Sequence, residues 1–162
     1  MWGTDMTETI TIREGRTNVF VAVEHANSEV VGIHASRSAN RFEALEPVRQ
    51  GVHRCFGAIA PGVARDYMSG DFQDEIECLG IEASPSFVRE PEGNGVAERF
   101  IRTLKENLLW VRTFDTIEEL RAALVEFATR YNETWLVARH GYRTPAQVRV
   151  INAGLIRTQR PT

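Results

Sequence analysis

The chain has 162 residues, 43% of them apolar, and a net charge of −3, which suits one globular domain with its own core. Its longest apolar runs are far shorter than the roughly 20 residues that cross a bilayer, so we expect no membrane span. The start has neither a basic n-region nor an apolar h-region, which predicts no secretory signal and a cytoplasmic protein.

The first third of the chain predicts three strands. Residues 5–12, 18–24 and 29–35 are rich in Val, Ile, Phe and Thr, which favour extended backbone. A polar turn with Asn27 and Ser28 separates the second and third runs. The pattern therefore predicts an antiparallel hairpin there, with the first strand beside it.

The next apolar pattern has nearly helical spacing, and Asn40 stands where an N-cap belongs. An interior proline removes a backbone donor, so Pro47 predicts a helix in two pieces. Further on, a short helix is expected at 71–79 and a strand at 81–86. The apolar positions of the first helix are Phe42, Leu45, Val48, Val52 and Cys55.

Two long helices are predicted in the second half. The first runs from Asn94 to about Val111, and the second follows a capping box formed by Thr116 and Glu119. Strands followed by helices predict an α/β domain whose helices cover a mixed sheet. The apolar stripe of the first helix is Ala97, Ile101, Leu104, Leu108 and Val111, and that of the second is Ile117, Leu120, Leu124, Phe127 and Tyr131.

Two carboxylates stand out by their setting. Asp5 lies in a strand-forming segment, where the ordinary alternative is a solvated surface Asp. Glu98 shares a helix flank with Arg102 and Lys105. Such a flank could bring a metal-binding carboxylate and two cations to a DNA backbone, whereas the ordinary alternative is a Glu98–Arg102 pair that only stabilises the helix.

Three stretches resemble the catalytic core of insertion-sequence transposases of the retroviral-integrase type. They read W-G-T-D-M-T, then P-S-F-V-R-E-P-E-G-N-G-V-A-E-R-F-I-R-T-L-K-E-N, and finally Y-N-E-T-W followed by G-Y-R-T-P-A-Q-V. The resemblance covers residues 1–150 and leaves 151–162 as a C-terminal tail. It implies an RNase H-like fold and an Asp, Asp, Glu triad that binds two Mg²⁺ or Mn²⁺ ions, with Asp5 as the first ligand and Glu98 as the third.

The second ligand is where the chain departs from the family pattern. Only 31 residues separate Asp66 from Glu98, several fewer than the family leaves, which predicts a shortened or missing central strand near 62–69. Either Asp66 is the catalytic and metal-binding Asp and the turn after it was deleted, or the deletion removed the true ligand. The few apolar residues of 62–66 slightly favour loss. Asp71 is expected to cap the following helix instead.

The resemblance implies DNA integration by metal-dependent cleavage and strand transfer, with activity impaired by the deletion. A non-catalytic remnant that binds DNA or an intact transposase is the alternative, and an RNase H-like nuclease is a third. The expected partners are DNA and a second subunit, which is either another copy of this chain or an intact transposase. Residues 91–162 carry a net charge of +3 against −6 for the rest, so we expect Asn94, Arg102 and Lys105 to contact DNA.

The remaining conspicuous residues are expected to be structural. The aromatic rings of Phe100, Trp110 and Trp135 suit helix packing better than base stacking. Cys55 and Cys78 have no zinc or redox spacing and are expected to be reduced core thiols. Glu24 lies on a strand beside the expected site, either as a supporting carboxylate or as an ordinary strand-edge one.

Overall fold

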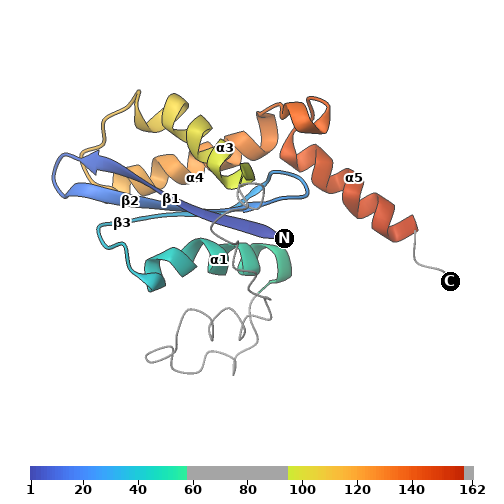
Figure 1. The fold of residues 1–162 in the computed structure, drawn as a ribbon, viewed down its shortest axis with the longest axis horizontal. Coiled ribbons are helices and arrows are strands. Elements are labelled where there is room, and N and C mark those ends of the chain that lie inside the picture. Colours follow the sequence, from blue (N-terminus) through green and yellow to red (C-terminus); the bar gives the residue numbers. More distant parts are fainter. Residues whose placement is uncertain (58–94, 159–162) are drawn as a thin grey trace, which may run out of the picture.

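Among the residues that the structure describes, a three-stranded sheet forms the centre of the domain (Figure 1). The computed structural model describes residues 1–57 and 95–158. The strands β1 (Trp2–Thr11), β2 (Gly15–Glu24) and β3 (Val30–Ser36) pair antiparallel in the order β1-β2-β3. The three predicted strands and the hairpin are therefore confirmed.

Part of the sequence prediction falls outside the described residues. This applies to the short helix at 71–79, the strand at 81–86 and the shortened central strand near 62–69. Within the described ranges, every strand of the sheet is antiparallel, and the one parallel pairing is a bridge from Thr11 to Phe114.

Helix α1 (Arg41–Phe56) covers one face of the sheet and begins as predicted, because the Asn40 side chain accepts a hydrogen bond from the Glu43 backbone N–H at 3.0 Å. The prediction of two pieces was wrong, since the helix runs unbroken through Pro47. Gly32 of β3 lies directly beneath that turn. A Cβ on Gly32 would be 1.9 Å from the Pro47 carbonyl oxygen, so the two backbones pack closely at this turn.

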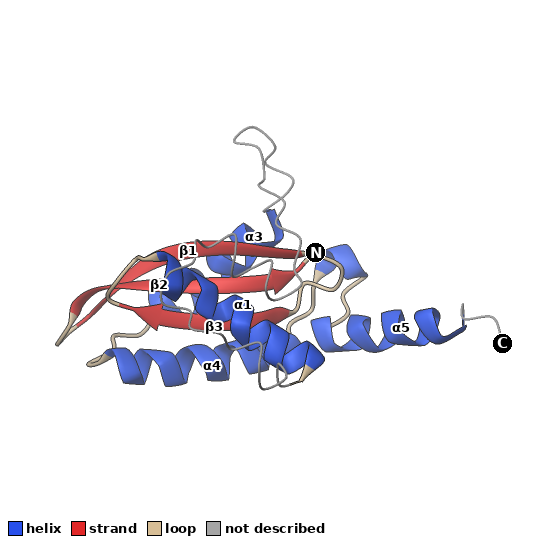
Figure 2. Ribbon diagram, turned by 90° about the horizontal axis from the view of Figure 1, so that it is seen from below, coloured by secondary structure: helices blue, strands red, loops and turns tan. Residues whose placement is uncertain are grey.

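The opposite face carries α3 (Gly95–Leu104), which continues into the π-helical turn η2 (Lys105–Leu109), and α4 (Ile117–Thr134) (Figure 2). The two predicted stripes are buried, with one exception. Val111 is 70% exposed because the wider π turn, closed by the Trp110 N–H on the Lys105 carbonyl, shifts the helical register before the helix ends. No described helix is both long and apolar enough to cross a membrane.

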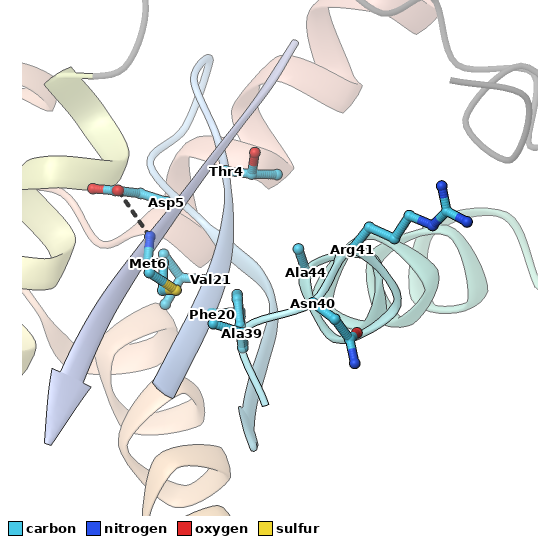
Figure 3. A pocket seen from close by; sticks show the side chains of 9 residues that line it. All are labelled: Thr4, Asp5, Met6, Phe20, Val21, Ala39, Asn40, Arg41 and Ala44. Carbon is cyan, nitrogen blue, oxygen red and sulfur yellow. Dashed lines mark hydrogen bonds between the residues drawn. The ribbon is translucent and has the colours of Figure 1, made fainter. Parts of the chain in front are cut away.

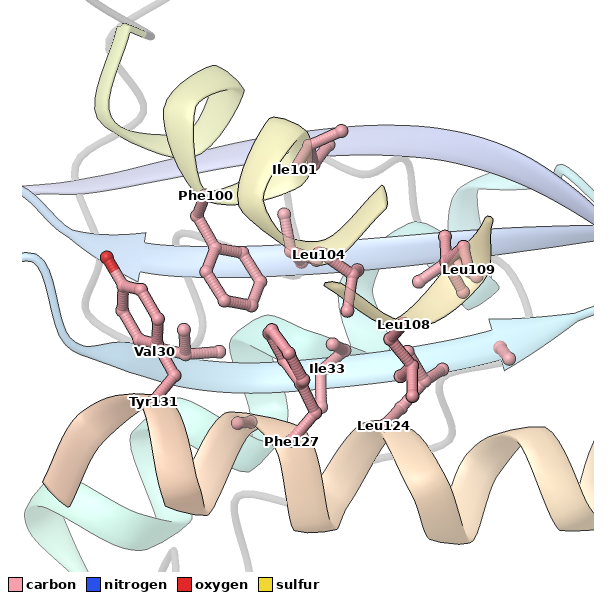
Figure 4. Packing of buried hydrophobic residues seen from close by; sticks show 14 of the residues in the cluster. Val30, Ile33, Phe100, Ile101, Leu104, Leu108, Leu109, Leu124, Phe127 and Tyr131 are labelled. Atoms are coloured by element: carbon pink, nitrogen blue, oxygen red, sulfur yellow. The ribbon is translucent and has the colours of Figure 1, made fainter. Parts of the chain in front are cut away.

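The main core lies between the sheet and the helices α3 and α4 (Figure 4). Phe100 is buried there, and its ring meets that of Tyr131 edge-on at 4.9 Å between centroids. Tyr131 in turn stacks on Trp135 at 5.9 Å. The packing roles of Phe100 and Trp135 are thus confirmed, whereas Trp110, which follows the π turn, is 71% exposed and its predicted packing role was wrong.

Cys55 corrects a second prediction about the core. It lies on the last turn of α1 and is exposed, so it is not a core thiol. The helix buries Leu45, Val48 and Val52 against the sheet, and Cys55 falls outside that face. Cys78 lies outside the described residues.

Beyond α4 the chain forms the 3₁₀ turn η3 (Ala138–His140) and the helix α5 (Pro145–Thr158). The helix packs beside α4 at its start and then extends away from the body of the domain (Figures 1 and 2).

Candidate functional site

Asp5 lies on β1 and faces the α3 side of the sheet. Its cross-strand partner is Val21, which belongs to the core beneath α3 and α4, and directly opposed residues share a face. Three positions earlier, Trp2 packs on the other face, where its ring lies against Gly51 of α1. Figure 3 shows the carboxylate turned toward α3, with one oxygen accepting the Met6 backbone N–H at 2.8 Å.

Glu98 lies on the first turns of α3, which packs against β1 and β2. Its side chain is exposed, whereas Ala97, Phe100 and Ile101 on the same helix are buried. Because the strand that carries Asp5 and the helix that carries Glu98 are in contact, the fold brings the two predicted ligands to neighbouring elements. Both are hard oxygen donors of the kind that Mg²⁺ and Mn²⁺ select.

A shallow pocket of about 350 Å³ lies beside Asp5, between β1 and the start of α1 (Figure 3). Thr4, Met6 and Phe20 line its sheet side, and Asn40 and Arg41 line its helix side. The Asp5 carboxylate also borders this pocket, although it points away from Asn40 and Arg41. Asp5 therefore stands at the border between the pocket and the α3 flank.

Two of the predicted site residues, Asp66 and Asn94, lie outside the described residues. Within residues 1–57 and 95–158, no three His, Cys, Asp or Glu side chains are grouped closely enough to hold a metal ion. Of the three carboxylates predicted as ligands from the sequence, two, Asp5 and Glu98, lie within the described residues.

The cations predicted on the Glu98 flank differ in their surroundings. Arg102 pairs with Glu106 at 2.9 Å rather than with Glu98, and this hydrogen bond raises the pKa of the arginine. The ordinary alternative of a Glu98–Arg102 pair was therefore wrong. Lys105 is half-buried at the start of the π turn and makes no ion pair with the residues that the structure describes.

Glu24, the expected strand-edge carboxylate, serves the turn that follows β2. One of its oxygens accepts the Ala26 backbone N–H at 3.0 Å and pairs with the amino group of Met1 at 3.2 Å. These contacts hold the turn and the start of β1, which assigns Glu24 a local structural role.

The Y-N-E-T-W stretch secures the fold around the start of β3. The Asn132 amide is buried, and it both accepts from the Val30 N–H and donates to the Val30 carbonyl, each at 2.9 Å. The same carbonyl accepts a hydrogen bond from Arg54 of α1. Asn132 therefore pairs the backbone N–H and C=O of Val30 on β3, an edge strand that has no further neighbour among the described residues.

The G-Y-R-T-P-A-Q-V stretch builds the start of α5. The Thr144 hydroxyl accepts the Gln147 N–H at 3.2 Å, and the Gln147 side chain accepts the Thr144 N–H at 3.0 Å. This is a reciprocal capping box with Pro145 at the first helical position, where a proline costs no hydrogen bond. This capping role was not predicted from the sequence, although the Thr-x-x-Gln spacing is typical of it.

The chain matches the integrase core domain family over residues 79–145. Among curated proteins it is 27% identical over 143 residues to the InsD transposase of the insertion elements IS2A/D/F/H/I/K of Escherichia coli, covering 82% of this chain and 47% of that protein. It has the same identity to the InsD protein of IS2E from E. coli strain K12, of which it covers 65%. The chain thus spans about half to two thirds of the length of these relatives.

Solved structures show the same architecture. The catalytic core domain of BIV integrase superposes with a TM-score of 0.63 at 20% identity, covering 98% of this chain and 97% of that one. A chain of the simian T-cell lymphotropic virus intasome, solved in complex with the PP2A regulatory subunit B56 gamma, superposes with a TM-score of 0.60 at 17% identity. It covers 91% of this chain and 52% of that one.

Proposed function

Because the chain is a homologue of the IS2 transposases with the RNase H-like fold of the retroviral integrase cores, we propose that it is the metal-dependent DNA strand-transfer core of a mobile element. One observation carries this proposal. Asp5 on β1 and Glu98 on α3, the two described residues of the expected triad, lie on elements that pack together, with Asp5 turned toward the helix.

Asp5 and Glu98 would hold the metal ions together with a third carboxylate, for which Asp66 is the candidate. Two such ions, when bound, would activate a water or a 3′-hydroxyl and stabilise the leaving oxygen. The protein's own contribution is to fix the carboxylates on a paired strand and a packed helix. Neutral side chains at these positions would hold divalent ions too weakly.

DNA is the proposed substrate, and Lys105, Arg102 and Asn94 are its proposed contacts on the Glu98 flank. The charge distribution supports this, since the excess of basic residues lies in the second half of the chain. Lys105 is the stronger candidate of the two cations, because Arg102 already pairs with Glu106. Assembly with further transposase subunits is also proposed, because the matched simian virus chain belongs to an intasome.

A non-catalytic remnant that binds DNA or an intact transposase is the second candidate. The shortened sequence between Asp66 and Glu98 favours it, because the strand that presents the second ligand is the part of the family pattern that this chain shortens. The two candidates differ in the number of working metal ligands.

Mn²⁺ binding tests the proposal without requiring activity. In a titration of the full chain followed by electron paramagnetic resonance of the free ion, we expect binding that Asp5→Asn and Glu98→Gln each weaken at least tenfold. Even loss of a supporting residue around a metal costs roughly 10–100-fold in affinity, so loss of a ligand should cost no less. Asp66→Asn then separates the candidates, since weakened binding makes Asp66 the second ligand and unchanged binding indicates that this ligand was lost.

Two exposed carboxylates provide matched controls. Asp115→Asn and Glu118→Gln remove the same charges near the start of α4, which adjoins the Thr11 end of β1 and not Asp5, and should leave Mn²⁺ binding unchanged. Equal affinities for the wild-type chain, Asp5→Asn and Glu98→Gln would contradict the proposed metal site.

A further inference from the structure

The strand β3 has the composition of a segment that pairs readily with other strands. It reads V-V-G-I-H-A-S and contains no proline and no Asp, Glu, Lys or Arg. Segments of about six or seven residues with high β-propensity and little charge form intermolecular sheets when their edge is exposed. On one side β3 pairs with β2, and on the other it has no strand among the described residues. That second edge is therefore a surface on which another strand could add.

Side chains from the two flanking helices occupy backbone groups along this edge. In an antiparallel pair, alternate residues direct their N–H and C=O groups away from the partner strand. The Ile33 N–H donates to the Gln50 side-chain oxygen of α1 at 3.0 Å. The Ala35 carbonyl accepts from Arg121 Nε of α4 at 2.8 Å. Backbone groups that a further strand would use are thus already bonded to side chains.

The start of β3 is covered in the same way. The Asn132 amide of α4 bonds both the N–H and the C=O of Val30, and Arg54 of α1 donates to the same carbonyl at 2.9 Å. The helices α1 and α4 lie on opposite faces of the sheet and both contact β3 (Figure 2). The four side chains therefore reach one edge from both faces.

The helices alone do not close this edge within the described part of the chain. A groove of about 110 Å³ runs between α1 and α4, and Val31 and Gly32 of β3 line it together with Thr129. Val125, which also lines the groove, is 58% exposed. Because the groove leads from solvent to the strand, the side-chain hydrogen bonds supply the protection that the helix backbones leave incomplete.

We propose that Gln50 and Arg121, together with Asn132 and Arg54, cap the β3 edge and prevent β3 of a second copy of this chain from pairing with it. A second copy is the partner that the edge would take, because two identical antiparallel edges can pair about a two-fold axis. An incoming strand would have to displace the capping side chains and leave their polar groups without partners. The caps act whether or not the chain binds metal or DNA, and assembly with further subunits would use other surfaces.

Self-association of the full chain carrying Gln50→Ala/Arg121→Ala tests the caps. Sedimentation velocity over a range of protein concentrations should show self-association about tenfold tighter than that of the wild type, because two backbone groups on each copy become free to pair. Hydrogen exchange of the Ile33 amide locates the contact. It should be fast in the dilute variant, where Gln50 no longer accepts from this amide, and slow again at concentrations where copies associate.

Arg130→Ala/Asn107→Ala is the matched control. It also removes one arginine and one amide, so the net charge equals that of the test variant. Asn107 donates to the Thr103 carbonyl within its own helix, and the Arg130 guanidinium lies over a ring of α4 itself. Because neither side chain bonds β3, this variant should associate as the wild type does and keep slow exchange at Ile33.

Thermal unfolding shows whether the double variant is folded. If it is not, the single variants Gln50→Ala and Arg121→Ala carry the test, and Arg121→Lys, which keeps a donor for the Ala35 carbonyl, should behave as the wild type. Folded test variants with wild-type association and wild-type exchange at Ile33 would overturn the proposal. Equal association of the control variant, or association without renewed protection at Ile33, would overturn it as well, because the contact would then lie on another surface.

Discussion

At the scale of single residues, Gly32 sets how closely α1 approaches the sheet. A Cβ at this position would meet the Pro47 backbone at 1.9 Å, and backbone atoms cannot rotate away as a flexible side chain can. We expect Gly32→Ala to lower the free energy of unfolding by about 1–3 kcal/mol, because the helix must move off β3 to admit one methyl group. Urea unfolding followed by circular dichroism measures this change.

Gly95→Ala is the matched control, since a Cβ at Gly95 meets no atom within 4 Å and alanine favours helix. Its stability should equal or exceed that of the wild type. If Gly32→Ala were equally harmless, the close approach of β3 and α1 would not be the constraint that the structure indicates.

Residues that belong to a sequence motif could be identified from the sequence, but the ion-pair partners of charged side chains could not. Asp5 and Glu98 stood out because the residues around them form a recognisable pattern, and the fold places both on elements in contact. Arg102 was expected beside Glu98, yet Glu106 lies one turn away in the other direction and takes the pair. Helical spacing allows both partners equally, so only the packed structure distinguishes them.

At the scale of elements, α5 depends on its cap because most of the helix extends beyond the body of the domain. Thr144 is 5% exposed and satisfies the Gln147 N–H, one of the donors that a helix start leaves free. We expect Thr144→Ala to destabilise α5 by about 1 kcal/mol. Hydrogen exchange of the α5 amides should quicken, while the amides of β2, in the core of the sheet, keep their protection.

Thr134→Ala, at the end of α4, separates capping from the loss of any threonine. Its hydroxyl donates to the Arg130 carbonyl within the same helix and caps no N-terminus. Exchange in α5 should remain as in the wild type. If the α5 amides of the Thr144→Ala variant also exchanged as slowly as those of the wild type, packing against α4, and not the cap, would hold α5 in place.

The spacing of apolar residues and the capping residues predicted the strands and the two long helices well, because these elements bury an apolar face against the core. They did not predict the π turn at Lys105–Leu109, which changes the register and leaves Trp110 and Val111 exposed. A π turn has no composition of its own and depends on how α3 meets its neighbours. The unbroken α1 was missed for a similar reason, since Gly32 and Pro47 are 15 positions apart in sequence.

At the scale of the whole molecule, a stable fold and a working metal site place different demands on the chain. The superposition on the BIV catalytic core covers 98% of this chain, and the described sheet and helices form a continuous core. A stable fold needs only this packing, whereas a two-metal site also needs its ligands held within about 0.5 Å of the productive geometry. If the segment before Glu98 is shortened as the sequence predicts, we expect it to affect chemistry more than folding.

Strand transfer tests this difference. We expect the chain, fused to the DNA-recognition region of a related transposase and given Mg²⁺ and matching element ends, to join little or no DNA. This expectation rests on the prediction that the sequence around Gly62–Ser69 is too short for a ligand-bearing strand and turn. Inserting a strand-Asp-Gly-Ser-Gln segment between Ala64 and Tyr67 should restore metal-dependent cleavage, and adding Glu98→Gln to that variant should abolish it again. Robust joining by the unmodified fusion, lost on Asp66→Asn, would refute the expectation and identify Asp66 as the working second ligand.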